Sequence, residues 1–201
     1  MKIKICGLKY PGNISEVAKL KPDYMGFIFY HRSPRLVTES DFIDIPNDAI
    51  ETAVFVNESV DEIKKLVDKH NFGAVQLHGS EDPESCRLLK ENVKVIKALG
   101  VDEDFDFSQL IPYVGSVDFF LFDRKTDKHG GSGQAFDWKL LENYELNIPF
   151  FLSGGISLDN LEEVKSIRHP QYYGVDLNSR FEIEPGLKDI DKLKKAFEIL
   201  R

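Results

Sequence analysis

Polar side chains stand at the ends of several apolar, strand-like runs in this chain, and their chemistry is that of proton transfer. They are Cys6 at the end of the first run, His78 after the fourth, Asp123 after the sixth and Asp176 in the eighth. Thiol, imidazole and carboxyl groups all donate or accept protons. Each residue alone also has a structural explanation, since a lone cysteine is often a small buried side chain and an aspartate after a strand often caps a turn. Their common location favours a site, but no particular reaction follows from it.

Alternation within the first run predicts which side chains face one another. Ile3 and Ile5 share one face, while Lys4 and Cys6 share the other. We expect the isoleucines to pack against helices and Cys6 to face inward at the top, with Lys4 one layer below. Likewise, Gln76 should share the face of His78.

These residues need strands to position them, and short β-rich apolar runs recur through the whole chain. The eight runs span 3–6, 24–29, 50–56, 74–77, 93–98, 117–122, 148–152 and 172–177. Helices are predicted between them, over 59–70, from 82, over 157–167 and over 189–200, with weaker ones near 14–20, 39–43, 107–113 and 137–144. Ser59 with Glu62 forms a capping-box pattern.

Eight strand–helix units without a linker predict one parallel α/β domain over residues 1–201. A doubly wound open sheet and a closed barrel both fit this alternation. The similar length of the units favours a single-domain (β/α)8 TIM barrel, at the lower end of its size range. In such a barrel, the carboxyl ends of the strands carry the active site.

Short motifs in a defined order make the prediction more specific. They are Lys4-Ile5-Cys6-Gly7, Arg32-Ser33-Pro34-Arg35, Val54-Phe55-Val56-Asn57, Val75-Gln76-Leu77-His78-Gly79, Phe122-Asp123, Gly130-Gly131-Ser132-Gly133, Phe136-Asp137-Trp138, Leu152-Ser153-Gly154-Gly155-Ile156, Gly174-Val175-Asp176 and Gly186-Leu187-Lys188-Asp189. Together, from the first strand to the last helix, they closely resemble the phosphoribosylanthranilate isomerase family.

The resemblance implies an Amadori rearrangement in tryptophan biosynthesis, with no metal or organic cofactor. N-(5-phosphoribosyl)anthranilate would become 1-(2-carboxyphenylamino)-1-deoxyribulose 5-phosphate. An acid must protonate the ribose ring oxygen and a base must remove the C2′ proton; by the resemblance, Asp123 is the acid and Cys6 the base. Lys4 lies roughly 6–7 Å from Cys6 along the strand and could lower the thiol pKa. Asp123 needs a raised pKa, from burial or a nearby negative charge.

The resemblance also implies residues that bind substrate. Arg35 matches the arginine that holds the anthranilate carboxylate, Gln76 and His78 line the pocket, and the loop 130–133 closes over the substrate. Asp176 either places a negative charge near the acid or orients a substrate hydroxyl.

The phosphate is expected beyond the seventh and eighth strands, at a helix N-terminus. Gly154 and Gly155 let backbone amides approach it closely. Where the family commonly has a Ser-Ser-Gly-like turn, this chain has Asn178-Ser179-Arg180. Ser179 and Arg180 therefore join the predicted phosphate-binding residues, with Arg180 either contributing its charge or only its amide.

Other functions remain open or are disfavoured. A metal-dependent sugar-phosphate epimerase needs convergent His and Asp ligands, which are not evident. Indole-glycerol-phosphate synthase needs a lysine as its acid, and Lys97 is the faint candidate. A non-catalytic sugar-phosphate-binding barrel needs neither Cys6 nor Asp123. The net charge of −8 disfavours nucleic acid and anionic membranes as partners. We expect a cytoplasmic monomer or homodimer acting on a small phosphorylated substrate.

Overall fold

Eight parallel strands form a closed barrel in the computed structural model, which describes residues 1–38, 48–125 and 137–201. The strands are β1 (Lys2–Ile5), β2 (Tyr24–Ile28), β3 (Ile50–Phe55), β4 (Ala74–Leu77), β5 (Lys94–Val101), β6 (Phe119–Arg124), β7 (Phe150–Leu152) and β8 (Tyr172–Leu177). Each pairs with the next, and β1 pairs with β8, which closes the sheet. The barrel prediction is therefore confirmed, and the open-sheet alternative is wrong.

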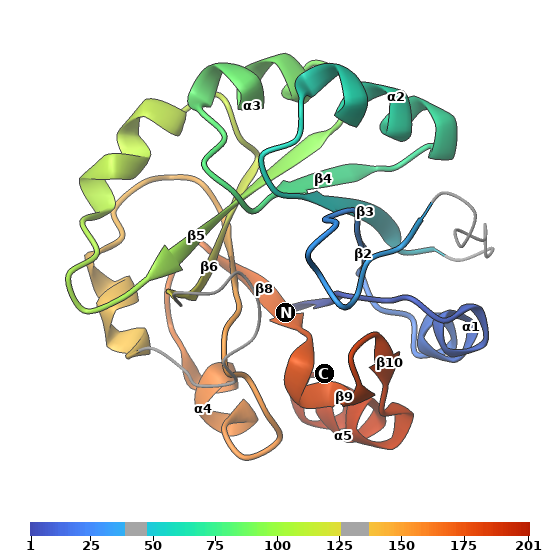
Figure 1. Ribbon diagram of the computed structural model, residues 1–201. Coiled ribbons are helices and arrows are strands. Elements are labelled where there is room, and N and C mark those ends of the chain that lie inside the picture. The colour runs from blue at the N-terminus through green and yellow to red at the C-terminus, as the bar shows by residue number, and fades with distance from the viewer. Residues whose placement is uncertain (39–47, 126–136) are drawn as a thin grey trace.

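Helices lie around the outside of the barrel (Figure 1). The α-helices are α1 (Pro11–Lys19), α2 (Val60–His70), α3 (Pro83–Lys90), α4 (Leu161–Ser166) and α5 (Ile190–Leu200). Side chains cap the N-termini of α2, α3 and α5. Ser59, Asp82 and Asp189 each accept a hydrogen bond from the backbone N–H of the residue three positions later.

Three helical segments differ from the predictions. The segments predicted over 107–113 and 137–144 are 3-10 helices, η1 (Phe107–Tyr113) and η2 (Trp138–Asn143). Pro112 lies within η1, where its missing N–H and its ring disfavour an α-helix. Helix α4 begins four residues later than predicted, because Asn160 instead ties down the preceding turn through Ser157 N and Gly155 O. The helix predicted near 39–43 lies outside the described residues.

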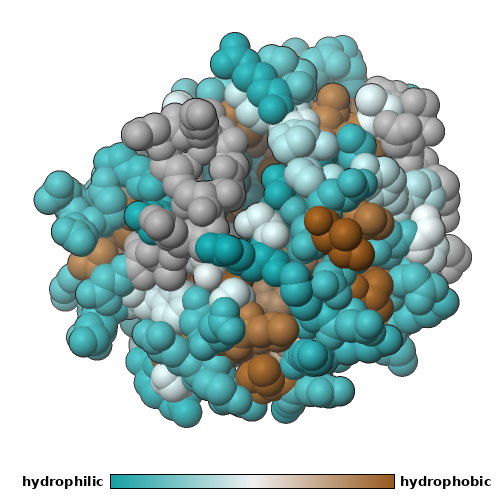
Figure 2. Space-filling model, turned by 60° about the horizontal axis from the view of Figure 1, so that its bottom comes forward, coloured by the Kyte–Doolittle hydropathy of each residue, from teal (hydrophilic) through white to brown (hydrophobic). Residues whose placement is uncertain are grey.

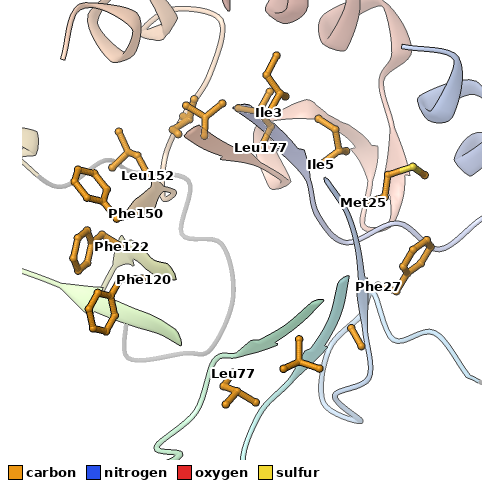
Figure 3. Close-up of a cluster of buried hydrophobic side chains, with 14 of the residues drawn as sticks. Ile3, Ile5, Met25, Phe27, Leu77, Phe120, Phe122, Phe150, Leu152 and Leu177 are labelled. Atoms are coloured by element: carbon orange, nitrogen blue, oxygen red, sulfur yellow. The ribbon is translucent and has the colours of Figure 1, made fainter. Parts of the chain in front are cut away.

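The strands bury hydrophobic side chains on both faces. Those on the outer face form a ring between the barrel and its helices, as Figure 3 shows for Ile3, Ile5, Met25, Phe27, Leu77, Phe120, Phe122, Phe150, Leu152 and Leu177. The placement of Ile3 and Ile5 there, with Lys4 fully buried on the inner face, agrees with the alternation predicted for β1.

Aromatic rings fill the amino-terminal half of the barrel interior. Tyr24 packs edge-on against Phe151 and Phe119, and Phe119 packs against Tyr173 with ring centroids 4.7 Å apart. Because these rings occupy the space near the amino ends of the strands, the polar interior residues gather near the carboxyl ends.

A short hairpin not anticipated from the sequence follows β8. After η3 (Ser179–Phe181), β9 (Glu182–Glu184) pairs with β10 (Leu187–Lys188) in antiparallel register, so that Glu182 faces Lys188. Gly186, at φ +91°, makes the turn between them.

The molecular face in Figure 2 is mostly hydrophilic, with hydrophobic residues in small separate patches.

Candidate active site

One cavity of about 430 Å³ is lined by all of the predicted site residues. They are Cys6, Arg35, Gln76, His78, Asp123, Gly154, Gly155, Asp176, Ser179 and Arg180. They come from the carboxyl ends of strands and the loops that follow them, the end of a parallel barrel where backbone groups and side chains converge. A volume of this size suits a small ligand.

Cys6 directly follows β1 and is almost completely buried. One layer below, the Lys4 ammonium donates a 2.9 Å hydrogen bond to Asp176 Oδ1, with both side chains buried, and interacts with the Cys6 thiol. Burial raises the pKa of the Cys6 thiol, and Lys4 opposes that effect without cancelling it. The expected influence of Lys4 therefore has the predicted direction, but burial outweighs it, and the resting group is a thiol.

Gly26, on the neighbouring strand, has no side chain and so leaves room for the Cys6 thiol and the Lys4 ammonium. A Cβ at Gly26 in β2 would lie 2.8 Å from Cys6 Sγ and 3.2 Å from Lys4 Nζ. The thiol and the ammonium therefore occupy space that any other residue at position 26 would take.

Asp123, at the end of β6, has the properties of a proton donor. Burial raises its pKa to about 6; the hydrogen bond from Arg124 N opposes this, and the negative charge of Asp176 adds to it. About a quarter of the side chain remains exposed toward the cavity, at 27%. A carboxyl with this pKa is protonated in about one molecule in ten at pH 7. It is also close enough to neutrality to give up its proton readily.

Gly154 packs against this carboxyl. It has φ +82°, and a Cβ there would lie 2.6 Å from Asp123 Oδ1 and 2.5 Å from Arg124 N. The loop after β7 can approach Asp123 only because residue 154 is glycine.

β4 contributes a pair of side chains to the same wall of the cavity. Gln76 Nε2 lies 3.0 Å from His78 Nδ1, and His78 Nε2 lies 3.6 Å from Asp123 Oδ2. Gln76 Oε1 is buried and has no hydrogen-bond partner among the described residues. A buried acceptor in this state is suited to a ligand hydroxyl.

A buried ion pair behind β4 holds the turn that carries His78. Lys97 Nζ donates to Leu77 O, Gly79 O and Ala98 O and lies 3.0 Å from Glu81 Oε2. The Glu81 carboxylate in turn accepts from Gly79 N. Lys97 thus clamps the backbone on both sides of His78, a role that the sequence did not suggest.

The predicted phosphate-binding residues lie together beyond β7 and β8. Gly154 and Gly155 are consecutive left-handed residues, with φ +82° and +70°. Ser179 and Arg180 begin η3 after β8, and Arg180 is exposed. The expected helix N-terminus does not adjoin the glycine pair, because α4 starts only at Leu161. The predicted loop 130–133 lies outside the described residues.

Arg35 reaches the cavity from the loop after β2, and its main partner is a residue that the sequence analysis missed. Glu182 accepts hydrogen bonds from Arg35 Nε at 2.9 Å and from Nη2 at 2.6 Å, and it also accepts from Lys188 Nζ at 2.8 Å. The Pro185-Gly186 turn signal could have predicted the hairpin that pairs Glu182 with Lys188. Nothing local predicts that Arg35 meets them.

No group of three or more His, Cys, Asp or Glu side chains within residues 1–38, 48–125 and 137–201 is arranged to hold a metal ion. Among the same residues, no helix is both long and apolar enough to span a membrane.

Comparisons with known proteins agree on one family. The family model described as N-(5'phosphoribosyl)anthranilate (PRA) isomerase matches residues 3–199. The N-(5'-phosphoribosyl)anthranilate isomerase of Parabacteroides distasonis is 46% identical over 98% of this chain and 92% of its own length. That of Nostoc punctiforme is 39% identical over 100% of this chain and 98% of its own.

Solved structures show the same similarity. The phosphoribosyl anthranilate isomerase of Thermotoga maritima superposes with a TM-score of 0.89 at 32% identity, covering 100% of this chain and 98% of that one. A second isomerase structure, with a TM-score of 0.86 at 30% identity and the same coverage, is a complex with reduced 1-(o-carboxyphenylamino)-1-deoxyribulose 5-phosphate. With this fold, this cavity and a family match over nearly its whole length, the chain belongs to the N-(5'-phosphoribosyl)anthranilate isomerase family.

Proposed function

We propose that this chain isomerises N-(5-phosphoribosyl)anthranilate to 1-(2-carboxyphenylamino)-1-deoxyribulose 5-phosphate in tryptophan biosynthesis, with Asp123 as general acid and Cys6 as general base. The observation that carries the proposal is a carboxyl with a pKa of about 6 in the same cavity as a buried thiol flanked by an ammonium. The reaction needs one group that gives a proton and one that takes a proton, which these two supply without a cofactor.

The acid acts first. Protonated Asp123 donates its proton to the ribose ring oxygen, the bond from that oxygen to C1′ breaks, and the anilino nitrogen supplies the electron pair that forms a Schiff base. The raised pKa of Asp123 suits this step, since an ordinary aspartate is almost fully ionised at pH 7.

The base then removes the C2′ proton. The Cys6 thiolate takes this proton, and the C2′ electron pair moves toward the Schiff base to give an enolamine. Protonation of the enolamine at C1′, with loss of the proton from the 2′-hydroxyl, yields the ketone product. The Lys4 ammonium beside Cys6 stabilises the thiolate, which burial disfavours.

The remaining residues hold the two ends of the substrate apart. Arg35 binds the anthranilate carboxylate, for which a guanidinium offers paired donors. Backbone groups at Gly154, Gly155 and Ser179, with the charge of Arg180, bind the phosphate. Between them, Gln76 and His78 face the ribose, and Gln76 Oε1, which has no hydrogen-bond partner in the described part of the chain, accepts a hydrogen bond from a hydroxyl.

Asp176 acts indirectly in this scheme. It is buried, bound to Lys4, and raises the pKa of Asp123 through its negative charge. Of the two roles considered for it, these contacts favour that of a charge near the acid over that of a partner for a hydroxyl.

The alternative enzymes are less well supported. A synthase of the indole-glycerol-phosphate type would need Lys97 as its acid, but the Lys97 ammonium already donates to three backbone carbonyls and pairs with Glu81. A barrel that only binds sugar phosphates would have no need for a desolvated carboxyl at the cavity wall, because burying it lowers stability.

The test follows the loss of anthranilate-type fluorescence when the protein is mixed with fresh phosphoribosylanthranilate, without added metal. Cys6→Ala should abolish turnover and still bind the reduced product analogue. Cys86→Ala is the matched control, since Cys86 is also a buried free cysteine but lies in α3. Turnover by Cys6→Ala at the rate of Cys86→Ala would exclude the assigned base, and no turnover by the folded wild type would exclude the activity.

We also propose that the protein works in the cytoplasm on this small phosphorylated substrate, independently of nucleic acid and membranes, as a monomer or homodimer. One solved relative is described as monomers generated from the dimeric isomerase of Thermotoga maritima. Light scattering on the purified protein would assign the oligomeric state.

A further inference from the structure

Glu182, which the proposed mechanism does not use, lies at the centre of a buried cluster. Its carboxylate accepts from Arg35 through Nε and Nη2, from Lys188 Nζ, and from Gly186 N at 3.1 Å. The side chain is only 4% exposed. Glu182 is thus held rigidly by its own hairpin, and it binds an arginine that comes from the other side of the β1 strand end.

The geometry of the contact orients the Arg35 guanidinium. Glu182 engages the edge formed by Nε and Nη2, with contacts of 2.9 and 2.6 Å. A guanidinium has a second edge, formed by Nη1 and Nη2, which can bind another carboxylate in a fork. Gly7, at φ +75°, lets the arginine pass, because a Cβ there would lie 2.6 Å from Arg35 Cδ.

Lys188 sets the charge of this cluster. Its ammonium is fully buried and donates to Glu182 Oε1 and to Asn178 Oδ1, both at 2.8 Å. Arg35, Glu182 and Lys188 carry two positive charges and one negative charge, so the cluster has a formal charge of +1. An Arg–Glu pair alone would be neutral; the additional lysine leaves a charge that a ligand carboxylate complements.

We infer that Glu182 is a positioning residue for the substrate carboxylate, holding Arg35 by one edge so that its other edge faces the cavity, while Lys188 keeps the cluster cationic. This inference rests on the proposed function, because the carboxylate is that of the anthranilate group. Glu182 itself does not touch the substrate.

Glu182→Gln separates this role from simple attraction, since it removes the orienting charge while raising the formal charge of the cluster to +2. Attraction alone predicts tighter binding of a carboxylated ligand. Positioning predicts weaker binding: KM should rise about tenfold or more, as for loss of a charge-assisted contact, with a smaller fall in kcat.

Two probes locate the effect on the ligand. Affinity for reduced 1-(o-carboxyphenylamino)-1-deoxyribulose 5-phosphate should fall with KM, whereas affinity for ribulose 5-phosphate, which lacks the carboxylated ring, should stay at the wild-type value. Glu184→Gln is the matched control: it lies in the same hairpin, and its carboxylate accepts from the exposed Tyr10 hydroxyl. This control should leave both affinities unchanged.

Glu182→Asp provides a second variant, which keeps the charge but withdraws the carboxylate from Arg35 by one methylene, and it should raise KM in the same direction. An unchanged or lowered KM in folded Glu182→Gln overturns the inference, as does equal weakening of both probes. So does failure of both Glu182 variants to fold while Glu184→Gln folds, because Glu182 is then structural. If the wild type neither turns over substrate nor binds the carboxylated probe, it is the proposed function that fails.

Discussion

Replacing Gly154 by alanine should damage catalysis more than stability, because this glycine packs against the proposed acid. Two effects contribute to the loss. The backbone at residue 154 has φ +82°, which costs an alanine about 1–2 kcal/mol. The new Cβ would also lie 2.6 Å from Asp123 Oδ1 and 2.5 Å from Arg124 N, whereas Cβ atoms in proteins essentially never lie closer than 3.0 Å to such atoms.

The steric effect falls on the carboxyl proposed as the general acid. To restore ordinary contact, Asp123 and the Arg124 amide that donates to it must move by several tenths of an ångström, up to about 1 Å, and a displacement of that size at a reacting group lowers the rate about a hundredfold. The backbone strain should lower Tm by about 2–8 °C in a chain of this length.

Gly115 supplies the matched control. Its φ is +86°, and a Cβ there meets no atom of the described residues within 4 Å. Gly115→Ala therefore carries the same backbone strain without the collision. Fluorescence assays of kcat and thermal melts of both variants separate the two effects. If Gly154→Ala kept the kcat of the wild type and lost no more Tm than Gly115→Ala, the packing argument for Asp123 would be refuted.

Three further changes test other parts of the site. Asp123→Asn should raise the free energy of unfolding at pH 7 by up to ~3 kcal/mol, since burial shifts the carboxyl pKa from an ordinary 3.8 to about 6 and so disfavours the folded, ionised form. That gain should vanish as the pH falls through 6 to below about 4, where the carboxyl is protonated in both the folded and the unfolded state. Urea titrations of both proteins at pH 7 and below about pH 4 measure the gain. An equal gain at the two pH values would contradict the prediction. Lys97→Met leaves the buried Glu81 carboxylate without its ion-pair partner and should lower the free energy of unfolding by about 3–5 kcal/mol. Lys94→Met, at an exposed position of the same strand, should barely change Tm. Equal melting points for the two variants would show that the Lys97–Glu81 pair contributes nothing to stability. Gly26→Ala should lower kcat by crowding Cys6 Sγ and Lys4 Nζ. Gly12→Ala, whose Cβ meets nothing within 4 Å among the residues that the structure describes, should leave kcat unchanged; a loss of kcat in both variants, or in neither, would count against the crowding argument.

Much of the fold and the membership of the site followed from local patterns in the sequence. A strand alternates its side chains whatever the rest of the chain does, so the inward direction of Lys4 and the outward direction of Ile3 could be predicted from five residues. Polar residues at strand ends must converge once parallel strands close into a barrel, which explains why the predicted residues line one cavity.

Tertiary structure alone decided the partners and the charge states. Closure of the barrel sets the register that puts Lys4 opposite Asp176, 172 residues along the chain, and brings Arg35 to Glu182 across 147 residues. The pKa of Asp123 depends on burial by other strands, and that of Cys6 on a contest between burial and Lys4. Side-chain direction is a property of a few neighbouring residues, whereas desolvation and ion pairing depend on segments that only the closed fold brings together.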